Sequence, residues 1–227
     1  MNYPEGPTDK AKIDSTENNA ELIGVNDFGS VYMHGPFGDK SSDVRIAYVI
    51  GMHPLESKSH RALFDELTQR KDLKYCYYIY NIHVNNTNSD TEGRLEGQLL
   101  AQEFIKDDII DKKYTLFLDI HSNRGLRGPG EYEITNFVFA PGFDDNSTRY
   151  VNDIIDSIEE LVYYAPEHRT SPPFIKEPTA NARIPTIVYE CYTYEKMEFT
   201  RMLASKLVSC VDNMEIVWDT TKNYYFI

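Results

Sequence analysis

Short apolar runs alternate with longer amphipathic stretches along most of the chain. The apolar runs are rich in β-branched and aromatic residues and predict buried strands, at 45–51, 73–84, 114–121, 136–140 and 186–192. The amphipathic stretches repeat their apolar positions with the spacing of one helix face and predict helices, at 57–67, 95–110, 148–163 and 195–211. This alternation predicts a single-domain, three-layer α/β/α fold around a mixed, largely parallel central sheet.

The remaining segments are less regular. Residues 1–20 are polar and predict a flexible N-terminal leader, so the domain is expected to cover 21–227. Apolar runs on both sides of Asn26-Asp27-Phe28-Gly29 predict a hairpin, which the Gly and Pro residues of 34–38 should break. The segment 165–185 carries five prolines and is expected to be an irregular loop that covers a binding pocket. The residues at 215–218 and 224–227 are expected to add structure at an edge of the sheet.

Composition narrows the class of protein. A net charge of −13 over 227 residues argues against binding to nucleic acid or to an anionic membrane, since both need a basic face. No apolar run has the length of a membrane span, and the N-terminus lacks the apolar core of a signal peptide. Three cysteines without a CxxC motif suggest reduced thiols. A cytoplasmic protein is therefore expected.

Ionisable side chains follow three of the predicted strands. His53 and Glu56 come directly after the strand at 45–51, His121 ends the strand at 114–121, and Glu190 interrupts the apolar run at 186–192. Ligands usually bind at the carboxyl ends of strands in open α/β sheets, so these side chains are expected to meet. Asp119 lies two residues before His121 and is a candidate to accept the second imidazole N–H.

This set of side chains has the composition of a hydrolytic zinc site. Two histidines and one glutamate, here His53, Glu56 and His121, form a common catalytic ligand set for one Zn²⁺ ion. A further glutamate, Glu190, could then act as the general base, although a structural ion pair is the alternative for this residue. His60, four residues after Glu56, could support the ligands or lie on a solvated helix face.

The ordered motifs resemble those of the zinc carboxypeptidase superfamily, in particular its succinylglutamate desuccinylase/aspartoacylase branch. The resemblance rests on His53-x-x-Glu56, on Asp119-x-His121 and on Glu190, with intervals of 121 − 56 = 65 and 190 − 121 = 69 residues, and covers about 45–212. It implies zinc bound by His53, Glu56 and His121, and hydrolysis of an amide bond with Glu190 as the base. The implied substrate is a peptide C-terminus or a small N-acyl amino acid.

The resemblance also implies an arginine that polarises the scissile carbonyl and a group that binds a substrate carboxylate. Arg94 is the best candidate for the first role, because it lies between the second and third ligands at the start of a predicted helix. The Asn-Arg pair of the family is missing from that interval. The candidate substrate-binding residues are instead Asn123, Arg124, Arg183 and Tyr192.

Two other functions remain open at this stage. A non-catalytic metal- or ligand-binding protein on the same fold would explain the three metal ligands but would not need Glu190. A purely structural interaction domain would leave the His and Glu positions without an explanation. The sequence gives no indication of the oligomeric state.

Overall fold

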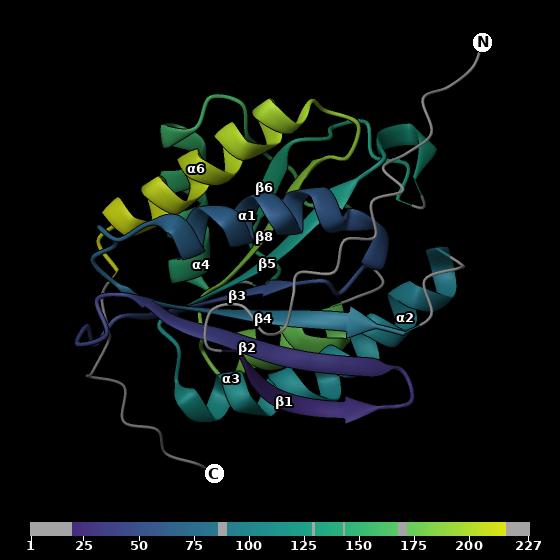
Figure 1. Cartoon of the computed structure of the whole chain (residues 1–227). Helices are drawn as coiled ribbons and strands as arrows, with labels where there is room; N and C mark the ends of the chain where they lie inside the picture. Colours follow the sequence, from purple (N-terminus) through teal and green to yellow (C-terminus); the bar gives the residue numbers. More distant parts are fainter. Residues whose placement is uncertain (1–19, 86–89, 129, 143, 168–171, 217–227) are drawn as a thin grey trace.

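An eight-stranded mixed sheet forms the centre of the molecule (Figure 1). The computed structural model describes residues 20–85, 90–128, 130–142, 144–167 and 172–216. The strand order is β1-β2-β4-β3-β5-β8-β6-β7. The strands are β1 (Glu21–Asn26), β2 (Gly29–Gly38), β3 (Arg45–Ile50), β4 (Cys76–Val84), β5 (Leu116–Asn123), β6 (Phe137–Phe139), β7 (Val162–Tyr163) and β8 (Thr186–Tyr192).

Helices cover both faces of this sheet (Figure 1). One face packs against α1 (Ser57–Gln69), α4 (Asp145–Ser157) and α6 (Met197–Asn213), and the core between them includes Leu63, Ile120 and Leu207. The other face packs against a continuous helical stretch made of α2 (Asp90–Leu100), a π-helical turn (Ala101–Ile105) and α3 (Lys106–Lys112). The prediction of a three-layer α/β/α fold with a mixed, largely parallel sheet is confirmed.

The central strands are parallel, and this arrangement brings the predicted site residues to one edge of the sheet. Strand β3 pairs in parallel with β4 and β5, and β5 pairs in parallel with β8. In the β5–β8 register, His121 lies opposite Glu190. Antiparallel pairs occur between β1 and β2, β2 and β4, and β6 and β8.

In two places the structure forms a strand where the sequence predicted none. Strand β2 does not stop before 34–38 but continues to Gly38, because a register shift between His34 and Phe37 lets it keep pairing with β4. The helix predicted over 148–163 ends at Ser157, and Val162–Tyr163 forms the short strand β7 beside β6. Strand β7 has only two residues and both are exposed, so the sequence has no alternation of apolar and polar residues that could predict it.

The proline-rich segment is more regular than predicted. It contains a π-helical turn, Pro172–Lys176, and the helix α5 (Glu177–Asn181). The predicted leader lies outside the described residues up to position 19, as do 217, 218 and 224–227 of the predicted C-terminal edge structure. Residues 215 and 216 are described and do not form a strand. Within the described part of the chain, no helix is both long enough and apolar enough to cross a membrane.

Candidate metal centre

The turn after β3 carries the first two predicted ligands. Gly51 adopts φ +82°, and a Cβ at this position would lie 2.1 Å from the carbonyl oxygen of Ile82, so only glycine fits. His53 then precedes a short 3₁₀ turn, Pro54–Glu56, that leads into α1. Pro54 tolerates this position because the first turn of a helix leaves its N–H groups unpaired. Both His53 and Glu56 are buried.

The Glu56 carboxylate lies between the two histidines. Its Oε1 atom is 2.9 Å from Nδ1 of His53, and its Oε2 atom is 2.9 Å from Nδ1 of His121. The same carboxylate accepts a 2.8 Å hydrogen bond from Nη1 of Arg94 and a 3.1 Å bond from the backbone N–H of Ser122. Three segments that are far apart in sequence therefore converge on one buried carboxylate.

The donor set fits a metal ion. One ligand atom each from His53, Glu56 and His121 can be chosen so that all three lie within 4.8 Å of one another. The Nδ1 atoms of both imidazoles face the carboxylate, and the second nitrogens face other groups of the protein. Nε2 of His121 is 2.8 Å from Oδ2 of Asp119, and Nε2 of His53 is 3.3 Å from the side-chain amide of Gln98. Such partners fix the tautomer and orientation of metal-binding histidines.

The charges of this cluster are strongly coupled. Burial lowers the pKa of His53 to about 3. Burial also acts to lower the pKa of His121, but the carboxylates of Asp119 and Glu56 outweigh it and raise this pKa to about 9. Burial opposes ionisation of Glu56, yet the two histidines hold its pKa well below the ordinary value. Glu56 is therefore an anion at neutral pH, as a metal ligand must be.

Glu190 is buried on β8 beside His121, with 8% of its surface exposed. Burial raises its pKa to about 7, although the neighbouring His121 acts in the opposite direction. Its Oε2 atom accepts a 3.2 Å hydrogen bond from Nδ2 of Asn123. A carboxylate with a pKa near neutrality can both accept and return a proton at physiological pH, which is the property that a general base needs.

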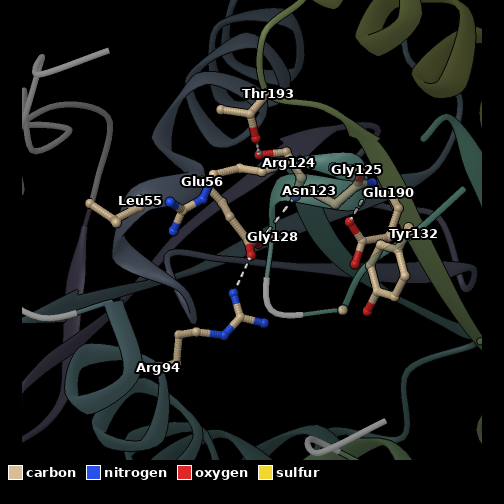
Figure 2. Close-up of a pocket in the computed structure, with 12 residues that line it drawn as sticks. Leu55, Glu56, Arg94, Asn123, Arg124, Gly125, Gly128, Tyr132, Glu190 and Thr193 are labelled. Carbon is tan, nitrogen blue, oxygen red and sulfur yellow. Dashed lines mark hydrogen bonds and ion pairs between the residues drawn. The ribbon is translucent and has the colours of Figure 1, made fainter. Parts of the chain in front are cut away.

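A pocket opens above these side chains (Figure 2). It has an empty volume of about 410 Å³, part of which is open solvent. Figure 2 shows Arg94 and Glu56 on one side of it and Glu190 and Tyr132 on the other. The lining residues are Leu55, Glu56, Arg94, Ser122, Asn123, Arg124, Gly125, Gly128, Gly130, Tyr132, Glu190 and Thr193.

A close approach of α2 brings two polar side chains to the ligands. A Cβ at Gly97 would lie 1.9 Å from the carbonyl oxygen of Met52, so glycine allows the helix to pack directly against the His53 turn. Arg94 and Gln98, one helical turn apart, then contact Glu56 and His53. Arg94 was a candidate from the sequence and Gln98 was not, although the i, i+4 spacing places both residues on one helix face.

The other predicted substrate-binding residues have different positions. Asn123 and Arg124 line the pocket. Arg183 is exposed in the turn before Thr186, the first residue of β8, whereas the pocket lies at the other end of this strand. The prediction that Arg183 faces the site is therefore corrected. Tyr192 packs against Tyr194 beside the pocket and is not part of its lining.

The proline-rich segment does not cover the pocket in the part that the structure describes. None of the residues 165–167 and 172–185 lines it. Ile175 and Lys176 are instead buried on the face of the sheet that packs against α2 and α3, and Nζ of Lys176 lies 2.8 Å from Oδ2 of Asp119. The described part of the expected lid therefore lies against the sheet at Ile175 and Lys176, whose side chains are buried.

Comparisons with known proteins give matches at the level of structure. No protein-family model matches this chain, and no curated protein matches it in sequence. A metallo-carboxypeptidase from Burkholderia cenocepacia superposes with a TM-score of 0.56 at 11% identity, over 87% of this chain and 65% of that protein. The metallo-carboxypeptidase of Pseudomonas aeruginosa, in complex with (2-guanidinoethylmercapto)succinic acid, gives 0.53 at 12% identity, over 81% and 60%.

A third match is the product-bound cell shape determinant protein Csd4 of Helicobacter pylori, with a TM-score of 0.56 at 12% identity, over 86% of this chain and 54% of that protein. At these identities the matches establish the fold, which is that of the metallo-carboxypeptidases. This chain spans 54–65% of the length of the three proteins.

Proposed function

We propose that this protein is a zinc-dependent hydrolase of amide bonds. The observation that carries the proposal is the convergence of His53, Glu56 and His121, with ligand atoms within 4.8 Å of one another, at the sheet edge that also holds Glu190. Two histidines and one carboxylate form a catalytic zinc site when a fourth position stays open for water or substrate. The carboxypeptidase-like fold supports the same assignment.

In the proposed reaction, Glu190 and Arg94 of the pocket have separate roles. A bound zinc ion would supply a Lewis acid that makes a water molecule more acidic and polarises a carbonyl. Glu190 accepts the proton of the attacking water and delivers it to the leaving nitrogen, for which its pKa of about 7 is well placed. Arg94, whose guanidinium contacts Glu56 inside the pocket, polarises the scissile carbonyl.

The pocket supports an anionic substrate. Arg94 and Arg124 both line it, although the chain as a whole carries a net charge of −13. Arg94 is already paired with Glu56, so we assign the binding of a substrate carboxylate to the guanidinium of Arg124. We infer that the substrate is an N-acyl amino acid, as in the succinylglutamate desuccinylase/aspartoacylase branch, or the C-terminus of a peptide. The three free cysteines support a reducing compartment such as the cytoplasm.

The replacement of Glu190 by Gln tests the mechanism, because it keeps the size of the side chain and removes the base. The Glu190→Gln variant should bind one zinc per chain and unfold at a similar temperature, while kcat falls by about 100-fold or more. Zinc content, melting temperature and rate should be measured on one preparation with N-acyl amino acids and short peptides. Glu198→Gln, on the exposed start of α6, is the matched control and should keep full activity.

The alternative function, a metal- or ligand-binding protein without turnover, predicts a different result. In that case Glu190 is a buried structural anion, and its replacement changes stability without changing zinc content. A zinc-loaded Glu190→Gln protein with full activity would refute the proposed mechanism. A wild-type protein that holds zinc but hydrolyses none of the substrates would support the binding function instead.

A further inference from the structure

Lys176 inserts a buried positive charge next to the candidate metal centre. Its Nζ atom lies 2.8 Å from Oδ2 of Asp119, and the same oxygen lies 2.8 Å from Nε2 of His121. The exposed fractions are 4% for Lys176, 0% for Asp119 and 2% for His121. Lys176 of the proline-rich segment therefore contacts Asp119 of β5, and Asp119 contacts the imidazole of His121, which faces Glu56.

The backbone that carries Lys176 is firmly anchored. The preceding Ile175 is fully buried in the core between the sheet and α3. The Thr179 hydroxyl contacts the carbonyl oxygens of Ile175 and Lys176, each at 2.9 Å, and the Thr186 hydroxyl at 3.2 Å. Since Thr186 begins β8, the position of the lysine is tied to the strand that carries Glu190.

A buried carboxylate needs compensation, because burial disfavours its charge. The Asp119 carboxylate has two partners, because Nε2 of His121 and Nζ of Lys176 each lie 2.8 Å from its Oδ2 atom. Both partners contact the same carboxylate oxygen, so the lysine fixes the atom that faces the imidazole. A lysine that only balanced charge would not need to share this oxygen.

We propose that Lys176 is a positioning residue of the metal centre, which acts through Asp119 to orient the His121 imidazole toward the metal. This inference rests on the proposed function and adds a residue from a segment that does not line the pocket. Lys176 holds Oδ2 of Asp119 in place, and this oxygen in turn holds Nε2 of His121. The Nδ1 atom of His121 then stays directed at the metal position beside Glu56.

The test is the affinity for zinc, measured by competition with a chromophoric chelator. Lys176→Met keeps most of the length of the side chain and removes its charge. We expect the zinc dissociation constant to rise by about 10- to 100-fold, as for other residues that support metal ligands. Asp119→Asn should give a loss in the same range, and the double variant should be no weaker than Asp119→Asn alone, because the lysine acts only through the aspartate.

Lys112→Met is the matched control. Lys112 forms a 2.7 Å ion pair with Asp108 on α3 but has no contact with a metal ligand among the described residues, so this variant should bind zinc like the wild type. A Lys176→Met protein that melts at a lower temperature and keeps the wild-type zinc dissociation constant would overturn the proposal, since the lysine would then be purely structural.

Removal of Lys176 alone leaves a buried carboxylate without one of its partners and could prevent folding. The double variant removes both charges, so it provides the second test against Asp119→Asn. Equal zinc dissociation constants in these two proteins support the proposal, and a weaker double variant overturns it. A wild-type protein that binds no zinc would overturn the proposed function together with this inference. Tight zinc binding by wild type and Lys176→Met alike would overturn this inference alone.

Discussion

Both polar atoms of the Asn123 side-chain amide form hydrogen bonds within the protein. Its Nδ2 atom donates to the carbonyl oxygen of Thr135 at 2.9 Å and to Glu190 at 3.2 Å, and its Oδ1 atom accepts from the backbone N–H of Gly125 at 3.1 Å. The sequence-based interpretation made Asn123 a substrate-binding residue. Its contacts favour a role in holding Glu190, the proposed general base, which leaves Arg124 as the stronger candidate for substrate contact.

The Asn123→Leu variant distinguishes a role in substrate binding from a role in holding Glu190. The hydrogen bond from Asn123 lowers the pKa of Glu190, so its loss should raise this pKa further above its ordinary value. We expect the acid limb of the kcat profile to move to higher pH by about one unit, equivalent to a bond of roughly 1.4 kcal/mol, with KM nearly unchanged. A large rise in KM with an unmoved pH profile would instead identify Asn123 as a substrate-binding residue.

His60 joins three elements at the base of the site. It lies on α1, accepts a 3.2 Å hydrogen bond from the backbone N–H of Gly51 after β3, and donates through Nε2 to the carbonyl oxygen of Ile120 on β5 at 3.0 Å. This arrangement requires the neutral imidazole, and burial lowers the pKa of His60 to about 4. His60 is thus buried and structural, which excludes the solvated helix face considered from the sequence.

The hydrogen bonds of His60, which join α1 to β3 and β5, predict a contribution to stability that depends on pH. A histidine whose pKa is lowered on folding stabilises the protein fully above its unfolded pKa of about 6.5, and this stabilisation is lost as the pH falls toward 4. The lowering of the His60 pKa corresponds to roughly 3 kcal/mol in the free energy of unfolding at neutral pH. Urea unfolding of chelator-treated wild type and His60→Phe should give free energies that differ by a few kcal/mol at pH 7.5 and converge at pH 4.5.

The control for this experiment is Thr68→Val on α1, because the Thr68 hydroxyl does not ionise and contacts only the backbone carbonyl oxygens of Phe64 and Asp65 among the bonds of the described residues. Its difference from the wild type should change little over the same pH range. A His60→Phe difference that stays constant with pH would show that the contribution of His60 is packing alone.

The same elements show what the sequence pattern could and could not predict. Strands β3, β5 and β8 are buried on both faces, so their apolar runs were recognised, and parallel pairing then placed His53, His121 and Glu190 at one edge. Lys176 and Gln98 had no comparable signal. A lysine among prolines is usually solvated, and only the packing of Ile175 under the sheet turns it toward Asp119.

Two hydrophobic cores stabilise the sheet, one on each face, and among the described residues neither contains a candidate metal ligand. The core on one face is formed with α1, α4 and α6, and the core on the other face with the α2–α3 stretch. Among the candidate ligands, Glu56 also contacts both histidines and Arg94 directly. Metal removal should therefore leave the fold in place, in contrast to small zinc-dependent domains that unfold without their ion.

Zinc should nevertheless raise the melting temperature, because it binds the folded chain and joins the β3 turn to β5. At a free zinc concentration of about 100 times the dissociation constant, one site adds roughly 2.7 kcal/mol, or about 5–10 °C for a chain of this length. Calorimetry of chelator-treated and zinc-loaded protein measures this shift, and circular dichroism tests whether the metal-free fold is retained. His121→Ala should keep the fold and lose the shift. Unfolding of the wild type by chelator alone would contradict a metal-independent core, and an equal shift in His121→Ala would place the zinc at another site.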